Sequence, residues 1–449
     1  MEFITQVITV LDDIVWGPIM MALILGTGLY LTVGLRFVPW LKLGEGMRLT
    51  WHGRTKNDEV HGELSPFQAL MTALAATVGT GNIAGVATAI FTGGPGALFW
   101  MWCTAMVGMA TKFAETVLAQ KYREVTPAGH VVGGPMYYIK NGLGPRWAWL
   151  GSLFAIFGGL CGFGIGNMTQ AHSIADSMHA SFGIPVEVTA VAVFVLLAIV
   201  VLGGVSRIGA VSGKLVPFMS VVYVLCAVVV IGMNLDKVPG VFALIIHDAF
   251  TGTAALGGFA GATVMQALRM GVARGIFSNE AGLGSAAMAH ATATTDDAVA
   301  MGYVGMLGPF IDTIIICTMT GLTILCSGLW NIEGAVSGAP LTSAAFEASL
   351  PGIGSAMVAI CLAMFAFSTI LGWCVYSERC WIYLLGDRAL KPFRIIFVCV
   401  VPVGAMLSLD LAWLIADVLN ALMAVPNLIG LLLLSPVLFK MVREYNTKN

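Results

Sequence analysis

Two short polar clusters interrupt long apolar runs in this 449-residue sequence. The cluster at residues 77–82 reads TVGTGN, and the cluster at residues 278–285 reads SNEAGLGS. Glycines beside polar side chains are poor material for a helix interior, so each run is expected to break at its cluster. A helix broken inside a membrane offers N–H groups to an anion and freed carbonyl oxygens to a cation. The predicted chemistry is therefore the binding of a small charged solute together with an ion.

An acidic residue, Glu280, lies inside the second cluster. A carboxyl group at membrane depth is costly unless it serves a transport pathway or a partner, which favours a functional site. The alternative for one cluster alone is that its glycines only let neighbouring helices pack closely. The two clusters lie five predicted helices apart, as in transporters built from inverted five-helix repeats, and this spacing favours a transport site.

The elements that must position these clusters are membrane-spanning helices. Hydrophobic residues make up 58% of the chain and charged residues 10%, whereas soluble domains average roughly 45–50% and 25%. Apolar runs of about 20 residues recur along the sequence, and in lipid only a helix satisfies the backbone hydrogen bonds of such a run by itself. The predicted fold class is an all-α polytopic membrane protein in contact with the lipid bilayer.

About eleven spans follow from the apolar runs and the polar breaks between them. They are predicted near residues 14–37, 66–92, 96–121, 147–179, 184–204, 213–234, 258–290, 299–328, 351–384, 392–413 and 415–439. The amino terminus, MEFITQVITVLDD, is acidic where a signal peptide would be basic, so the first run is expected to be a retained helix.

The distribution of Lys and Arg predicts the orientation of these spans. If the loop after the first span is cytoplasmic, 18 of the 22 basic residues lie inside and only Lys237 lies outside. Such a bias is what the positive-inside rule requires. The amino terminus is therefore expected outside and the carboxyl terminus in the cytoplasm, with the protein in the cytoplasmic (inner) membrane of a bacterium.

Several classes of function are excluded. The formal net charge is −2 and no basic face is concentrated in the sequence, which excludes a nucleic-acid partner. The nine cysteines contain no C-x-x-C pair, so neither a disulfide framework nor a zinc site is supported. A phosphate-binding G-x-x-x-x-G-K-S/T motif is missing, which excludes ATP hydrolysis as the energy source. No nucleophile–base spacing supports an enzyme, and no obligate protein partner is predicted.

The stretch GGPGALFWMWCTAMVG at residues 93–108 resembles the signature of the sodium:alanine symporter family, also called alanine-or-glycine:cation symporters. The stretches GTGNIAGVATAI, GGPMYYIKNGLG, GNMTQAHSIAD and GIFSNEAGLGSAAMAHA are also similar to that family, so the resemblance covers nearly the whole chain. Cys103 departs from the aliphatic residue usual in the signature. The resemblance implies a symporter that imports alanine or glycine with sodium, its coupling ion, by alternating access.

The fold implied by the resemblance is that of the bacterial leucine transporter, within the amino acid–polyamine–cation superfamily. That fold has two inverted five-helix repeats with two broken helices, here preceded by one extra N-terminal helix. The predicted divisions are 1–65 for the extra helix and a cytoplasmic loop, 66–234 for the first repeat, 235–257 for an external connection, 258–439 for the second repeat and 440–449 for a cytoplasmic tail.

The same resemblance implies a sodium site between the first broken helix and a partner helix. Its predicted ligands are five oxygens, namely the carbonyls of Ala75, Val78 and Phe365 and the hydroxyls of Ser368 and Thr369. A hard cation prefers such an oxygen cage. The alternative for both hydroxyls is a hydrogen bond to the preceding turn of their own helix.

The implied substrate site lies beside that cage. The substrate carboxylate is expected to meet the backbone N–H groups of Thr80 and Gly81, at the start of the outer half-helix. Thr77 and Asn82 are expected nearby.

The other side of the implied site would receive the substrate's ammonium and its small side chain. Carbonyls freed around Phe277 and Ser278 and the amide of Gln170 are expected to accept from the ammonium. The rings of Phe277 and Trp373 are expected to close the pocket over a methyl group. The alternatives are ordinary packing for the rings and a structural interhelical hydrogen bond for Gln170.

Further charged residues lie within the predicted spans. Glu115 matches a superfamily glutamate that hydrogen-bonds to both broken helices, and Lys112, one turn earlier, could pair with it. Asp312 is a second buried acid with a structural or functional role. Arg274 could form an outer gate with Asp417.

Two other functions remain open from the sequence. One is an amino acid symporter coupled to protons rather than sodium. The other is a channel or facilitator in which the two breaks form a filter.

Overall fold

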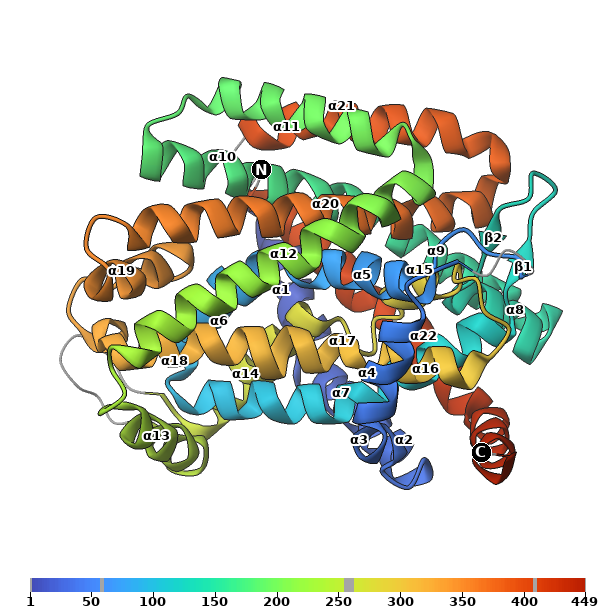
Figure 1. The fold of residues 1–449 in the computed structure, drawn as a ribbon, viewed down its shortest axis with the longest axis horizontal. Helices are drawn as coiled ribbons and strands as arrows, with labels where there is room; N and C mark the ends of the chain where they lie inside the picture. The colour runs from blue at the N-terminus through green and yellow to red at the C-terminus, as the bar shows by residue number, and fades with distance from the viewer. Residues whose placement is uncertain (1, 57–59, 254–261, 407–409, 449) are drawn as a thin grey trace.

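The structure, a computed structural model, describes residues 2–56, 60–253, 262–406 and 410–448. These residues are almost entirely helical, and the one named sheet among them pairs β1 (Glu124–Val125) with β2 (Val131–Val132) in antiparallel fashion. Figure 1 shows long helices lying side by side along the long axis of the molecule. The predicted all-α class is confirmed.

The helices of the first half of the chain are α1 (Glu2–Val15), α2 (Pro18–Gly34), α3 (Val38–Leu41), α4 (Leu43–His52), α5 (Pro66–Thr77), the π-helix η1 (Gly81–Gly85), α6 (Val86–Gly93), α7 (Gly96–Lys121), α8 (Pro135–Leu143), α9 (Ala148–Phe163), the π-helix η3 (Gly164–Met168), α10 (Thr169–Phe182), α11 (Val186–Val201) and α12 (Gly204–Gly232).

The helices of the second half are α13 (Val238–Thr251), α14 (Val264–Asn279), α15 (Ser285–His290), α16 (Ala298–Gly305), α17 (Leu307–Pro309), the π-helix η4 (Phe310–Cys317), α18 (Thr318–Ser327), α19 (Ala339–Ser349), α20 (Gly354–Leu385), α21 (Leu390–Met406) and α22 (Asp410–Lys448). Short 3₁₀ turns occupy Pro145–Trp147, Leu329–Asn331 and Asp387–Ala389.

The lengths and composition of these helices make the chain a multi-pass membrane protein. Within the described ranges, seven helices are long and apolar enough to cross a membrane, and the bent pair Pro66–Thr77 and Gly81–Gly93 passes the same test together. The predicted spans 96–121, 184–204 and 258–290 lie outside that set. The count of eleven spans therefore stays a prediction.

The two ends of the bundle carry different elements. Figure 1 shows α13 and α19 at the left end, and the β1–β2 hairpin and α8 at the right end. Between them, α7 packs against α14, α16 and α2, while α20 packs against α9, α10 and α5. The helices that carry the two predicted breaks, α5 and α14, each therefore pack against one of the long helices α20 and α7.

The first break falls where the sequence predicts it. Ser65 and Gln68 start α5 with a reciprocal capping box, and Pro66 occupies the first turn, where its missing N–H costs nothing. The helix ends at Thr77, Val78 is extended with ψ of 90°, and the chain resumes as η1 after a bend of 51°.

The second break begins later than the sequence suggested. Ser278 and Asn279 are still helical in α14, and the break occupies residues 280–284. Glu280 has φ of +53°, Gly282 of +95° and Gly284 of +78°, so the chain turns through left-handed conformations that suit glycine. α15 then resumes at Ser285.

The first span also differs from its prediction, which placed it at 14–37. Helix α1 begins at Glu2, and Thr5–Gly34 forms one apolar stretch. The backbone of Gly17 is extended and Pro18 begins α2, so the helix is interrupted between α1 and α2. The acidic pair at residues 12–13 lies on the last turn of α1.

Candidate functional site

The predicted sodium ligands come together where α5 meets α20. The Ser368 hydroxyl donates to the Phe365 carbonyl at 2.8 Å and lies 3.2 Å from the Ala75 carbonyl oxygen and 3.5 Å from that of Val78. The Thr369 hydroxyl donates to the same Phe365 carbonyl at 3.0 Å. All five residues are buried, with exposures of 0–3%.

This arrangement leaves lone pairs on the carbonyl oxygens of the cluster without a hydrogen-bond donor. A serine hydroxyl has one hydrogen to donate, and three carbonyls lie within its reach. Several oxygens with unused lone pairs and no titratable side chain are the donor set that a hard monovalent cation fits. Thr369 follows the back-bonding alternative, whereas Ser368 both back-bonds and reaches across to α5.

The glycine of the first break allows α20 to approach closely. A Cβ atom on Gly79 would lie 2.4 Å from Oγ1 of Thr369, so no larger residue fits without displacement. The N–H of Gly79 donates to Oδ1 of Asn82 at 2.8 Å, which satisfies one amide freed by the break. Asn82 therefore belongs to the scaffold of the break rather than to the lining of the cavity beside it.

Asp312 connects the two broken helices. Its carboxylate accepts from Nδ2 of Asn82 at 2.7 Å, from the hydroxyl of Ser278 at 2.8 Å and from the hydroxyl of Thr313 at 2.7 Å. Asp312 lies in η4 and is fully buried. Because Asn82 and Ser278 lie on different broken helices, a single carboxylate links the first break to the second.

The second break is held by charged side chains from α7. Oε1 of Glu115 accepts from the N–H groups of Gly282 at 3.0 Å and Gly284 at 3.1 Å. The ammonium of Lys112 donates to the backbone carbonyl of Glu280 at 3.1 Å. The salt bridges of the described residues do not include the Lys112–Glu115 pair that the spacing suggested. The backbone of the break is thus clamped by one acid and one base.

Helix α22 completes this clamp. Nδ2 of Asn427 donates to Oε1 of Glu115 and to the carbonyl of Gly282, both at 2.8 Å. The hydroxyl of Tyr138 donates to Oδ1 of Asn427. The hydroxyl of Ser285 donates to Oε2 of Glu280 at 2.5 Å. The second break therefore has most of its polar groups satisfied by the protein itself.

A small central cavity lies between the two breaks. Its volume is about 20 Å³, room for about one water molecule. Its lining consists of Ala76, Thr77, Gly79, Thr80, Gly81, Ile165, Gln170, Phe277, Glu280, Thr369, Trp373 and Asn420. Of the predicted substrate residues, Asn82 and Ser278 are not part of this lining, and their side chains turn to Asp312 instead.

Two buried amide side chains line this cavity, Gln170 from α10 and Asn420 from α22. Nε2 of Gln170 donates to the carbonyl of Ile165 at 3.1 Å and lies 3.4 Å from Oγ1 of Thr80. Among the described residues, Oε1 of Gln170 and Oδ1 of Asn420 have no hydrogen-bond partner, although both side chains are 2% exposed. Unpartnered buried oxygens lining a cavity are acceptors available to a ligand.

Asn420 and Glu280 were missed as cavity residues. Asn420 is an isolated amide in the apolar run DVLNALMAV, and the cost of burying an amide in a membrane helix was the signal that could have found it. Glu280 was recognised as a buried acid, but not as lining the same cavity as Trp373.

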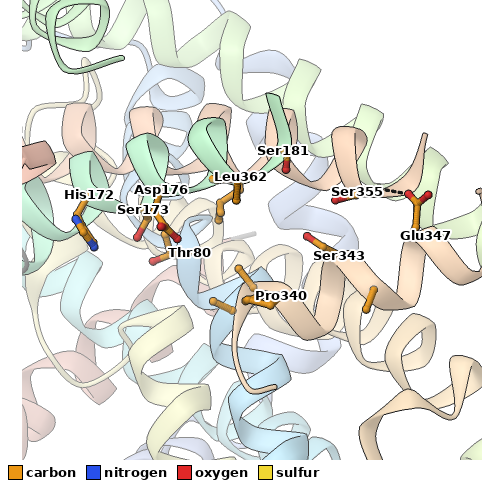
Figure 2. A pocket seen from close by; sticks show the side chains of 15 residues that line it. Thr80, His172, Ser173, Asp176, Ser181, Pro340, Ser343, Glu347, Ser355 and Leu362 are labelled. Carbon is orange, nitrogen blue, oxygen red and sulfur yellow. Dashed lines mark hydrogen bonds between the residues drawn. The ribbon is translucent and has the colours of Figure 1, made fainter. Parts of the chain in front are cut away.

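A larger cavity of about 420 Å³ lies beside the central one, between α10 and α19 (Figure 2). It is named here the outer cavity, after the side on which the predicted orientation would place it. Thr80 lines both cavities, so it stands between them. Asp176 and Glu347 bring acidic groups to the outer cavity. The backbone N–H groups of Ser355 and Gly352 donate to the Glu347 carboxylate and hold its pKa below its usual value.

The predicted outer gate is not closed by an ion pair. Within the described residues, Arg274 and Asp417 line one cavity without an N···O contact of 4 Å or less. Arg269 instead pairs with Asp13 at 2.7 Å.

The chain is similar in sequence to several transporters over nearly its whole length. The chain is 47% identical over 450 residues to a sodium/alanine symporter, AgcS, of Methanococcus maripaludis, covering 99% of this chain and 98% of the relative. It is 48% identical over 444 residues to an uncharacterized transporter of Haemophilus influenzae, covering 98% and 96%. It is 37% identical over 449 residues to a probable sodium/glutamine symporter, GlnT, of Bacillus subtilis, covering 99% and 91%.

Solved structures agree on the fold. A sodium-coupled sialic acid symporter matches with a TM-score of 0.50 at 13% identity, covering 91% of this chain and 82% of its own. A mutant of the Eremococcus coleocola manganese transporter matches with a TM-score of 0.50 at 16% identity, covering 82% and 77%. The family model described as the sodium:alanine symporter family matches residues 1–449. With this match and the full-length relatives, the chain, a transporter rather than an enzyme, belongs to the sodium:alanine symporter family.

Proposed function

We propose that the protein imports a small neutral amino acid, alanine or glycine, together with sodium by alternating access. The observation that carries this proposal is the convergence of the Ala75, Val78 and Phe365 carbonyls on the Ser368 hydroxyl. These oxygens are buried, uncharged and not titratable, which suits sodium better than a proton. The relative from Methanococcus maripaludis carries the name of a sodium/alanine symporter.

In this proposal the substrate occupies an enlarged form of the central cavity. Its carboxylate meets the N–H groups of Thr80 and Gly81, which begin a helical segment and so lack intrahelical partners. Its ammonium meets Oε1 of Gln170 and the carbonyls of the last turn of α14. Phe277 and Trp373 limit the space for the side chain, which favours a methyl group or hydrogen.

Carbonyls in the last turn of α14 are suited to this role. The N–H of Ala281 donates to Oδ1 of Asn279 at 3.0 Å, and the N–H of Gly282 donates to Glu115. The amides that would continue the helix are therefore engaged elsewhere. The carbonyls of Phe277 and Ser278 remain available to a ligand that enters the cavity.

The sodium proposal is tested by uptake into proteoliposomes. Labelled alanine should accumulate against its gradient when sodium is directed inward, and should only equilibrate when sodium is equal on both sides. Accumulation driven by a pH gradient in sodium-free buffer would contradict sodium coupling. Equilibration that no ion gradient turns into accumulation would support a facilitator instead.

Proton coupling is the second candidate because Glu280, a carboxylic acid, lines the central cavity. Glu280→Gln separates the two mechanisms. It should leave the sodium dependence of alanine binding in place if Ser368 and its carbonyls hold the coupling ion. Loss of all ion dependence with retained alanine binding would favour the proton.

We also propose that the amino terminus faces the outside and the carboxyl terminus the cytoplasm of a cell whose inner membrane holds the protein. The charge bias supports this orientation, because 18 of the 22 basic residues fall on the predicted cytoplasmic side and only Lys237 falls on the outer side. In intact cells, Lys237→Cys should react with a membrane-impermeant thiol reagent and Arg54→Cys should not. The reverse pattern would contradict the orientation.

A further inference from the structure

A third cavity, named here the α1 cavity, lies between α1, α14 and α22. Its volume is about 210 Å³, roughly ten times that of the central cavity. Asp12 and Trp16 line it from the α1 side, Arg274 from α14 and Asp417 from α22. The N-terminal helix thus contributes charge to a cavity inside the transporter.

The charged side chains of the α1 cavity, Asp12, Arg274 and Asp417, are half-buried, and among the described residues they form no ion pair with one another. Among the described residues, Nε of Arg274, Oδ1 of Asp12 and Oδ1 of Asp417 are buried atoms without a hydrogen-bond partner. Arg269 and Asp13, on the same two helices, do form an ion pair, at 2.7 Å. A buried polar atom without a hydrogen-bond partner is costly, so these three atoms favour a ligand that completes their interactions.

The arrangement of charge selects the kind of solute that can do so. A guanidinium recognises a carboxylate, and two carboxylates recognise an ammonium. A single inorganic ion would satisfy only one sign of charge, whereas the zwitterion of a small amino acid carries both. The rings of Trp16 and Phe277 supply apolar walls for the rest of such a molecule.

Phe277 connects the α1 cavity to the central cavity. Its half-buried ring lines both, so it is the partition between them. The Arg274 guanidinium lies 5.8 Å from the centre of that ring. A rotation of Phe277 would therefore open a path from one cavity to the other beside a guanidinium that can guide a carboxylate.

We propose that the α1 cavity is an outer binding station for the zwitterion of a small amino acid, from which the substrate passes Phe277 to the central cavity. Arg274 holds its carboxylate, and Asp12 and Asp417 hold its ammonium. The choice of alanine as the ligand rests on the proposed function. Binding at the station does not need sodium, because none of its groups belongs to the sodium cage.

Protection of a cysteine from alkylation tests the station. Ala273 lines the α1 cavity, and Ala273→Cys places a thiol there. In purified protein without sodium, L-alanine should slow alkylation of this thiol several-fold. N-acetylalanine lacks the ammonium and alaninamide lacks the carboxylate, so neither should protect. The unmutated chain measures the background reaction of the nine native cysteines.

Two further variants locate the protection. Arg274→Gln should raise the half-protecting alanine concentration about tenfold or more, since it removes a hydrogen bond to a charged group. Ser177→Cys, in the outer cavity of Figure 2, should remain unprotected and serves as the matched control.

Gln170→Ala separates this station from the central site. It weakens the proposed central site, and protection of the thiol at position 273 should persist in it. Protection that is absent, that survives Arg274→Gln, or that disappears in Gln170→Ala would overturn the station. Protection in a protein that never accumulates alanine would support the station while contradicting the proposed transport.

Discussion

The two breaks differ in what satisfies their backbone groups. At the first break, the carbonyls of Ala75 and Val78 face a single hydroxyl from Ser368, and among the described residues no charged side chain bonds to these two carbonyls. At the second, Glu115 accepts from two freed N–H groups and Lys112 donates to the carbonyl of Glu280. The first break therefore keeps lone pairs for a ligand, whereas the second is fixed by charges of the protein.

This difference assigns different tasks to two elements of similar shape. A break whose oxygens lack hydrogen-bond partners is stabilised when a cation binds to them. Its geometry can therefore respond to that cation. A break whose backbone groups already bond to an acidic and a basic side chain is stabilised little further by a ligand. We infer that the first break senses sodium and that the second provides a fixed wall for the substrate.

The largest expected effect is on the clamp of the second break. Glu115→Ala leaves the N–H groups of Gly282 and Gly284 and the side-chain amide of Asn427, all buried, without their acceptor. The free energy of unfolding should fall by about 3–5 kcal/mol. Thermal unfolding of the purified protein in detergent measures it.

A control variant keeps part of this clamp. Glu115→Gln retains one acceptor oxygen and should lose distinctly less stability than Glu115→Ala. If both variants were as stable as the unmutated protein, the second break would not depend on its charges, and the contrast between the breaks would fail.

The second largest effect concerns the close approach at the first break. Gly79→Ala places a methyl group 2.4 Å from Oγ1 of Thr369, and the overpacking should cost about 1–3 kcal/mol of stability. Thr369→Ala removes that oxygen, so the double variant should recover most of the loss. A double-mutant cycle in thermal unfolding measures the coupling. Additive effects would mean that the two helices separate easily at this point.

A smaller effect is expected on the affinity for sodium. Ser368→Ala removes the hydroxyl that lies near three carbonyls, and the sodium concentration for half-maximal alanine binding should rise about tenfold. Thr369→Ala should raise it less, since the Thr369 hydroxyl bonds only within its own helix. In both variants saturating sodium should restore alanine affinity, as linkage requires. An unchanged sodium midpoint in Ser368→Ala would remove that residue from the site.

The smallest effect distinguishes the two amides of the central cavity. Gln170→Ala and Asn420→Ala each remove one unpartnered acceptor, and each should weaken alanine binding roughly fivefold at every sodium concentration. Gln170 lies near Thr80 of the first break, so only its variant should also change the sodium midpoint. Equal sodium midpoints in the two variants would show that the amide beside the first break is not coupled to the ion.

Local features of the fold could be predicted because they depend on local sequence. The apolar run and helix bounds of α7 coincide with the predicted 96–121, and the glycines at 79 and 81 located the first break. The second break was placed too early because composition alone does not tell which residue turns left-handed. Here the turn falls on Glu280, held by Lys112, a contact between residues far apart in the sequence.

The remaining parts of the site depend on such distant contacts. The periodicity of one helix relates a residue only to neighbours three or four positions away, which is why Lys112 was paired with Glu115. The carboxylate of Asp312 between Asn82 and Ser278 joins segments more than 30 residues apart. The family resemblance supplied the five candidate sodium oxygens, and the roles of those residues stay predictions.

The small size of the central cavity has a consequence for the ion gradient across the membrane. The central cavity has room for about one water molecule, which is too small for a hydrated ion to pass between the described residues that line it. An elementary charge that crosses a potential of 100 mV dissipates about 2.3 kcal/mol. A wide cavity open to both sides would let ions leak across the membrane and dissipate the gradient that drives uptake. The close packing of Thr80, Phe277 and Trp373 around the cavity therefore limits such a leak.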